Sequence, residues 1–161
     1  MALKLHNRKW YPCIFVLGCA VVVGLWFRFA GGLRPELLAS GIGAVAGFTY
    51  FLYHQHLDET KLFKELFVEF NARYDDLNDP LNAIRFGTAE GDLVGEERDT
   101  AFSYFNLCAE EHFFYTAGYI DHQVWLSWRR GMKDFFDHPR IRHLWDSDCK
   151  SDSYHGFTPP K

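Results

Sequence analysis

The residues best suited to bind a ligand form a basic stretch near the C-terminal end of the sequence. Between residues 129 and 143, five side chains are Lys or Arg and two are acidic, with tryptophans at neighbouring positions. Cations of this kind neutralise phosphate groups, and aromatic rings stack on bases. The candidate ligand-binding residues are Trp128, Arg129, Arg130, Lys133, Arg140 and Arg142. This set predicts an anionic ligand, namely a nucleotide or an oligonucleotide.

The same cations have two other uses that the sequence leaves open. Residues 58–121 carry fifteen acidic side chains against five Lys or Arg. The basic stretch can therefore form ion pairs within the protein, which is the interpretation that this balance favours. It can also face the anionic headgroups of a membrane. The formal net charge of the chain is −4, which by itself indicates no nucleic-acid partner.

Three adjacent residues, Glu110, Glu111 and His112, have the atom types of a metal site. Consecutive residues of a helix point about 100° apart, so these three cannot all bind one ion. Helical ligand pairs are spaced by three or four residues, and the residue four positions after Glu111 is Tyr115. We therefore expect no metal and no cofactor. We expect instead that one of the two carboxylates is buried and hydrogen-bonded in a helical core.

The motifs of common enzyme classes are missing from the sequence. There is no serine nucleophile elbow, no phosphate-binding P-loop and no glycine-rich dinucleotide loop. The spacing from Arg130 to His138 and from Arg140 to His143 does not match the Arg–His motif of HEPN-type ribonucleases. An enzymatic function is therefore not expected.

Two apolar runs near the N-terminus predict a membrane anchor. Residues 13–29 contain one charged side chain, Arg28, and residues 37–53 contain none. Each run spans about 17 residues, which is the short end of the length that a bilayer helix needs. The link between them holds Gly31, Gly32 and Pro35, which favour a turn. We expect residues 1–54 to form an antiparallel transmembrane hairpin.

Small residues recur at four-residue intervals in both apolar runs. The candidate helix-packing or pore residues are Ala20, Gly24, Ala39, Ser40, Gly43 and Gly47. Small residues at this interval let helix backbones approach closely in lipid. The face that they form meets either the other helix of the hairpin, which is the favoured interpretation, or a second subunit. A pore lined by this face would be narrow and gated by an apolar constriction.

The positions of Lys and Arg predict the orientation of the hairpin. The cations that flank the outer ends of the two runs are Lys4, Arg8, Lys9, Lys61 and Lys64, and those near the link are Arg28 and Arg34. Because cytoplasmic flanks carry an excess of Lys and Arg, both termini are expected in the cytoplasm.

The rest of the chain is expected to be helical. No Gly or Pro occurs between Gly47 and Pro80, so the second membrane helix is expected to continue into the cytosol to about residue 78. Further helices are expected at residues 96–117, 122–137 and 139–145, after a loop at 87–95. The fold class is all-α, a transmembrane hairpin whose second helix enters a small cytosolic bundle at residues 55–149. The polar tail at residues 150–161 is expected to be flexible.

Several segments resemble a family of small bacterial membrane-anchored helical proteins that has no assigned activity. The resemblance covers about residues 62–157 and rests on these segments: FNARYDDLN at 70–78, YFNLCAEE at 104–111, GYI at 118–120, WLSW at 125–128, GM at 131–132 and RIRHLW at 140–145. It implies a helical domain attached to the bacterial inner membrane by an N-terminal segment. It implies no catalytic or binding residue.

The architecture also resembles that of pore-forming membrane effectors of antiphage defence. This likeness implies a homo-oligomer in the membrane lipid, with an ion-conducting pore that a nucleotide or nucleic-acid signal controls at the cytosolic domain. The alternative is a non-catalytic scaffold or accessory subunit of a larger membrane complex. Because likeness of architecture is a weak guide to function, no residue role follows from it.

Overall fold

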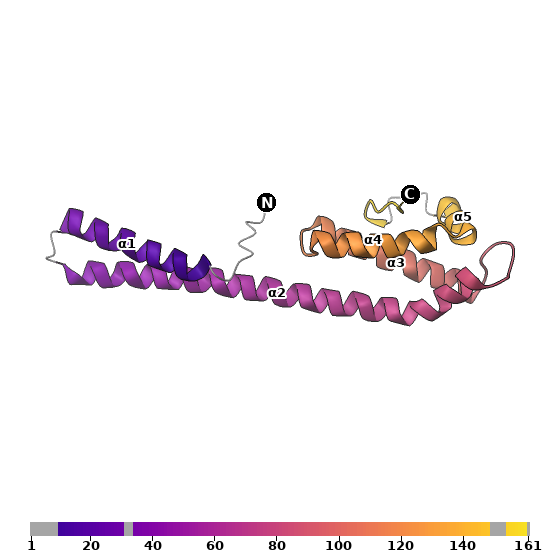
Figure 1. The fold of residues 1–161 in the computed structure, drawn as a ribbon, viewed down its shortest axis with the longest axis horizontal. Helices are drawn as coiled ribbons and strands as arrows, with labels where there is room; N and C mark the ends of the chain where they lie inside the picture. The colour runs from indigo at the N-terminus through magenta and orange to yellow at the C-terminus, as the bar shows by residue number, and fades with distance from the viewer. Residues whose placement is uncertain (1–9, 31–33, 149–153, 161) are drawn as a thin grey trace. The chain divides into compact units, whose positions relative to one another are not determined.

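The computed structural model describes residues 10–30, 34–148 and 154–160. These residues form helices and no strands, which confirms the all-helical fold class (Figure 1). The helices are α1 (Trp10–Ala30), α2 (Pro35–Phe86), α3 (Glu96–Thr116), α4 (His122–Phe136) and α5 (Pro139–Asp148). The chain divides into two compact units, residues 1–61 and residues 62–161, which we call the N-terminal and C-terminal units. The boundary lies within α2 and later than the predicted one at residue 54.

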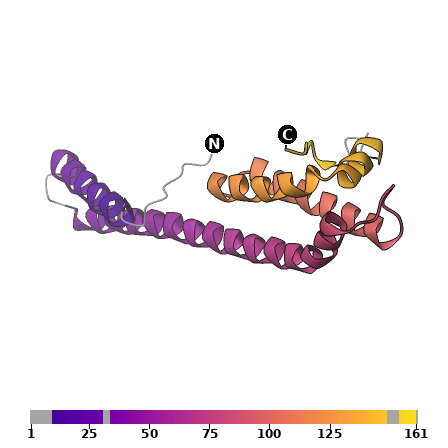
Figure 2. The same ribbon diagram turned by 45° about the vertical axis from the view of Figure 1, so that its right-hand side comes forward.

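In the N-terminal unit, α1 and the first part of α2 lie side by side and antiparallel (Figures 1 and 2). The ring of Tyr11 packs edge-on against Tyr53, with 5.6 Å between the ring centroids. At the other end of the pair, the indole N–H of Trp26 donates a hydrogen bond of 2.9 Å to the carbonyl oxygen of Arg34. Lys4, Arg8, Lys9, Gly31 and Gly32 lie outside the described residues.

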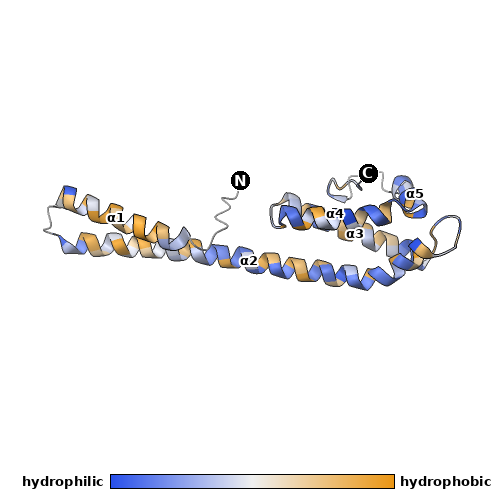
Figure 3. Cartoon of the chain, in the orientation of Figure 1, coloured by the Kyte–Doolittle hydropathy of each residue, from blue (hydrophilic) through white to orange (hydrophobic). Residues whose placement is uncertain are grey.

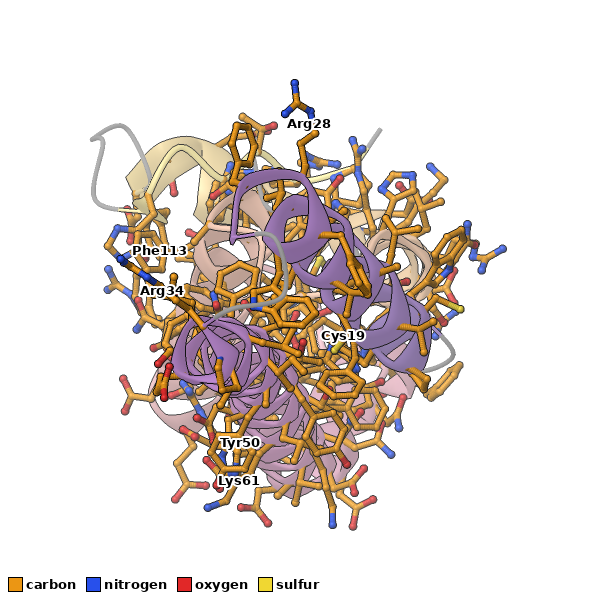
Figure 4. The ribbon with its side chains drawn as sticks, turned by 90° about the vertical axis from the view of Figure 1, so that its left-hand side faces the viewer. Cys19, Arg28, Arg34, Tyr50, Lys61 and Phe113 are labelled. Carbon is orange, nitrogen blue, oxygen red and sulfur yellow. The ribbon has the colours of Figure 1, made fainter. Side chains whose placement is uncertain are left out.

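The surface of this helix pair is apolar. α1 and α2 are each long and apolar enough to cross a membrane, by length and composition. Apolar residues cover most of α1 (Figure 3). Many of their side chains are open to the surroundings, as the 71% exposure of Leu17 and the 60% exposure of Phe48 illustrate. The charged side chain of Arg28 lies near the end of α1 and points away from the helix pair (Figure 4).

The second helix continues past its predicted end. α2 reaches Phe86 and contains Pro80, whereas the sequence predicted an end near residue 78. Proline lacks a backbone N–H and clashes with the preceding turn, so it bends a helix. α2 changes direction near its C-terminal end in both views (Figures 1 and 2). The turns after Pro80 are held by burial, since Leu81 is 0% and Ile84 2% exposed.

In the C-terminal unit, α3 is the most deeply buried helix. Its buried residues are Ala101, Tyr104, Phe105, Leu107, Cys108, Ala109 and Glu111. α3 is followed by Gly118 at a φ of 88°, a conformation that glycine adopts readily at the end of a helix. Asp121 then caps α4, as expected, because its carboxylate accepts a hydrogen bond from the backbone N–H of Gln123. Pro139 opens α5 in the position that suits a proline.

The C-terminal segment packs on this unit, which corrects the expectation of a flexible tail for residues 154–160. Phe157 is 5% exposed and contacts the rings of Phe136 and Trp145. The guanidinium of Arg142 donates a hydrogen bond of 3.1 Å to the carbonyl oxygen of Pro160. Burial of the Phe157 ring stabilises the packed position of this segment, although most of its other residues are polar.

We predict that Phe157→Ala lowers the free energy of unfolding by about 3 kcal/mol, the cost of emptying a buried aromatic site. The measurement is thermal unfolding of the detergent-solubilised protein, followed by near-ultraviolet circular dichroism. Thr158→Ala is the matched control, because Thr158 is exposed. Equal unfolding temperatures for the two variants would contradict the packing of this segment.

Candidate functional site

The predicted ligand-binding residues come from two helices of the C-terminal unit. Trp128, Arg129, Arg130 and Lys133 belong to α4, and Arg140 and Arg142 belong to α5. α4 buries one face, made of Trp125, Met132, Phe135 and Phe136. The residues between these positions lie at or near the surface, so the cations of α4 are turned away from the core.

Arg140 has a structural role that leaves little of it free for a ligand. Its side chain is 12% exposed and forms an ion pair of 2.5 Å with Glu97 at the start of α3. Its Nε donates a hydrogen bond of 2.8 Å to the carbonyl oxygen of Gly91, and Nη2 donates one of 3.3 Å to that of Asp92. Arg140 therefore links α5 to α3 through an ion pair and to the loop at residues 87–95 through hydrogen bonds.

Arg142 and Trp128 also serve the fold. Arg142 donates hydrogen bonds of 3.1 Å to the carbonyl oxygens of Phe136 and Pro160. The indole ring of Trp128 stacks on Phe67 of α2, with 5.9 Å between centroids and 17° between planes, and it meets Phe70 edge-on. Half of the predicted ligand set, Trp128, Arg140 and Arg142, thus makes contacts within the protein.

The other half remains at the surface of α4. Arg129 and Arg130 are exposed, and within the described part of the chain no ion pair holds them. Lys133 is paired with Asp137 at 3.1 Å, but both side chains are about half exposed. Lys133 follows Arg129 by four residues and Arg130 by three, so the three side chains lie within about 100° of one another around the helix. We call these three residues the α4 cation patch.

A polar recess of about 240 Å³ lies between the loop at 87–95, the start of α3 and α5. Its polar lining residues are Asp92, Arg98, Arg140, His143, Ser147 and Asp148. Arg98 forms an ion pair of 2.6 Å with Asp148, and His143 lies 3.5 Å from Asp92. Arg98 and Arg140, the two arginines of the recess, each already have an acidic partner. No sequence spacing indicates this recess, because its residues are spread over more than fifty positions of the chain.

The adjacent acids of α3 have different surroundings. Glu110 is 40% exposed and forms a bidentate pair with Arg73 of α2, at 2.5 and 3.2 Å. Glu111 is 6% exposed, and burial raises the pKa of its carboxyl to about 8, although the charge of Arg73 acts to lower it. One carboxylate is buried, as expected, but the bonds from Arg73 go to the other. Among the described residues, no group of three His, Cys, Asp or Glu is placed to hold a metal.

The contact between the two helices of the N-terminal unit is made by small residues other than the predicted ones. The close contacts are made by Gly18, where a Cβ would lie 2.7 Å from Val45, and by Gly41, where a Cβ would lie 2.6 Å from Val22. The predicted residues Ala20, Gly24, Ala39, Ser40, Gly43 and Gly47 are all exposed. The favoured interpretation of this face is therefore wrong. A helix turns by about 200° over two residues, so Ala39 faces away from the side that Gly41 occupies.

No protein-family model, curated protein or solved structure matches this chain. Two of the segments that carry the family resemblance, at 70–78 and 104–111, lie on α2 and α3 and contribute to the contact between these helices. Phe70 packs against Phe114 and Arg73 pairs with Glu110, so these residues have a structural role here. The membership of a family stays a prediction.

We predict that Arg140→Leu lowers the free energy of unfolding by roughly 3 kcal/mol, because Glu97 and two loop carbonyls lose their donor. Arg130→Leu, the matched change at an exposed site, should alter it by no more than about 0.5 kcal/mol. Thermal unfolding of the detergent-solubilised variants provides the measurement. Similar losses in both variants would contradict the structural role of Arg140.

The buried carboxyl of Glu111 predicts a pH dependence. The pKa of this group rises from an ordinary value of 4.5 to about 8, so the folded protein keeps a proton that the unfolded chain releases. The free energy of unfolding therefore falls as the pH rises between these two values. Glu111→Gln removes this fall and should be the more stable protein at pH 8, by on the order of a few kcal/mol.

The measurement for Glu111 is the unfolding temperature of wild type and Glu111→Gln from pH 4.5 to pH 8. Glu110→Gln is the control, because it changes the neighbouring acid without removing the buried one. A parallel pH trend in wild type and Glu111→Gln would show that this carboxyl is not the cause.

Proposed function

We propose that this protein is a homo-oligomer of the bacterial inner membrane whose N-terminal helices form or gate a narrow ion path. The first support is the apolar surface of α1 and the first part of α2. Side chains such as Val16, Leu17 and Phe48 are 60–71% exposed within a single chain. An apolar surface of this kind is stable against lipid rather than water, and helices satisfy all of their backbone hydrogen bonds there.

The observation that carries the proposal is the outward position of the small residues on α2. Among the described residues, a Cβ at Gly43 or Gly47 would meet no neighbouring helix or side chain within 4 Å, so their small size serves no contact there. Small residues at four-residue spacing allow close helix contact in lipid. We infer that this face meets the same face or a neighbouring face of a second copy.

An ion path built from these helices would be narrow. Residues 37–53 include no ionisable group other than tyrosine, and Ser40 is the polar member of the small-residue face. Conduction would therefore depend on water, backbone and hydroxyl groups, with apolar residues as the gate. This arrangement does not support a proton relay, which needs ionisable residues within the membrane.

The α4 cation patch is the proposed control point in the cytoplasm. Arg129, Arg130 and Lys133 are placed to attract an anionic group, either a nucleotide or nucleic acid or an acidic surface of a neighbouring subunit. Both chain termini are proposed to lie on this side of the membrane. The expected role in antiphage defence rests on architecture alone and stays a prediction.

A second candidate function is that of a non-catalytic scaffold or accessory subunit in a larger membrane complex. The observation that favours it is the use of Trp128, Arg140 and Arg142 within the fold. A scaffold needs no enclosed ligand site, whereas a nucleotide sensor does best with one.

The first experiment is the mass of the detergent-solubilised protein, by light scattering with correction for bound detergent, followed by ion flux in liposomes. We expect a closed oligomer that conducts ions. Gly43→Leu with Gly47→Leu should disperse the oligomer and abolish the flux, because larger side chains keep helices apart. The matched control, Gly43→Ala with Gly47→Ala, should retain both.

Two outcomes would overturn the proposal. A wild-type protein that is monomeric or a simple dimer in mild detergent cannot enclose a path by itself, and the scaffold function would then be the one to pursue. Unchanged assembly and flux in the leucine double variant would show that the small-residue face is not the contact between subunits.

A further inference from the structure

A groove lies between α1 and α2 near the start of α1, within the N-terminal unit. It has a volume of about 470 Å³. The rings of Tyr11, Phe15, Tyr50 and Tyr53 line it, and smaller residues on α1 and α2 complete the lining. This volume falls within the range of small-molecule sites, which is about 300–1,000 Å³. Its lining does not include Ala39, Gly43 or Gly47 of the small-residue face of α2.

The lining of the groove is fixed and apolar. Tyr11 is 7% exposed and is held edge-on against Tyr53, and it also contacts the ring of His56. Ala46 is small, and the hydroxyl of Thr49 donates its hydrogen bond to the carbonyl oxygen of Val45 at 2.8 Å. The hollow therefore presents methyl groups and ring faces, and it offers few polar groups to a ligand.

We infer that this groove binds one acyl chain of a membrane phospholipid, an inference that rests on the proposed insertion of the helix pair into a bilayer. Phe15 and Tyr50 line the groove and are 37% and 63% exposed, so the groove opens onto the same apolar surface that lipid would cover. A chain from the surrounding leaflet enters sideways without crossing water.

The aromatic residues indicate where the lipid headgroup lies. Tyrosine is enriched at the level of the headgroups, where its ring is apolar and its hydroxyl is wet. Tyr50 and Tyr53 are followed by His54 and His56, and the rings of Tyr50 and His54 are 4.4 Å apart. The polar end of the bound phospholipid therefore lies beside these histidines, with its acyl chain toward Ala46 and Phe15.

The size of the groove favours a chain over a helix from a second copy. The stretch of α2 that lines it, Ala46 to Tyr53, covers about two turns, or roughly 11 Å. A helix is about 10–12 Å wide and needs a longer seam to bind stably. An acyl chain is thin and flexible, and it fits a short hollow that has ring walls.

The test uses the full chain in liposomes that contain a phospholipid with a diazirine on its acyl chain. After illumination and proteolysis, mass spectrometry should find the lipid adduct on the groove residues Phe15, Ala46 or Tyr50. An even spread of adducts over the exposed apolar residues of α1 and α2 would overturn the inference. Cross-linking of a second copy at the groove would also overturn it, because a protein would then be the occupant.

A second measurement counts the phospholipids that remain on the detergent-solubilised protein, by native mass spectrometry. Ala46→Phe fills the groove, whereas Ala44→Phe adds the same ring at an exposed position outside the groove lining. We expect lipid retention to fall about tenfold in Ala46→Phe and to persist in Ala44→Phe. Equal retention in the two variants would overturn the site.

The recovery of wild type and both variants in the membrane fraction separates this inference from the proposed function. A wild-type protein that is absent from the membrane fraction would refute membrane insertion and the lipid groove together. A membrane-bound oligomer whose lipid retention is unaffected by Ala46→Phe would refute the groove alone.

Discussion

The C-terminal unit depends on one contact between aromatic rings, that of Phe136 with Phe105. Both side chains are 0% exposed, and their rings stack with 5.4 Å between centroids and 19° between planes. Phe136 lies at the end of α4 and also meets Trp145 of α5 and Phe157 of the C-terminal segment. One ring therefore joins elements that are far apart in the sequence. Buried aromatic residues supply more contact area than aliphatic ones, so a small unit of this size can be held by few such contacts.

This packing explains why the basic stretch does not behave as one site. Residues 129–133 belong to α4 and residues 140–142 to α5, and the short turn between them follows directly on Phe136. Burying Phe136 turns Arg140 toward the loop at 87–95 and Arg142 toward the C-terminal segment, where each donates a hydrogen bond to a backbone carbonyl. The cations of α4 are turned away from the core, toward the surface. Of the two arginines of α5, Arg140 pairs with Glu97 and Arg142 bonds to backbone carbonyls, so both are used within the protein.

Local signals in the sequence predicted most of the helices. Gly118, Asp121 and Pro139 have strong positional preferences, so the ends of α3 and the starts of α4 and α5 followed from them. The end of α2 could not be predicted in this way. Pro80 either ends the helix or only bends it, and tertiary contacts of the following turns decide which. The partner of Arg140 is 43 residues away and could not be inferred from spacing. The polar recess and the packing of Phe157 could not be predicted for the same reason, because they also depend on contacts between residues far apart in the sequence.

Periodicity predicted a small-residue face on α2 but did not determine what this face contacts. Helix geometry puts Gly41 and Val45 on one side and the stripe at 39, 43 and 47 on another, and sequence spacing alone does not rank two such faces. In the structure, a Cβ at Gly41 or Gly18 would lie at short distance from a valine of the opposite helix, whereas one at Gly43 or Gly47 would meet no side chain of the described residues. In water, an exposed stripe of small residues does not by itself make two helices associate. Between lipid-facing helices it sets how closely two backbones can approach, because no hydrophobic force acts there and contact distance decides association. The exposed stripe and the contacting glycines therefore agree with the proposed assembly, in which α1 would bind one side of α2 and a second subunit the other.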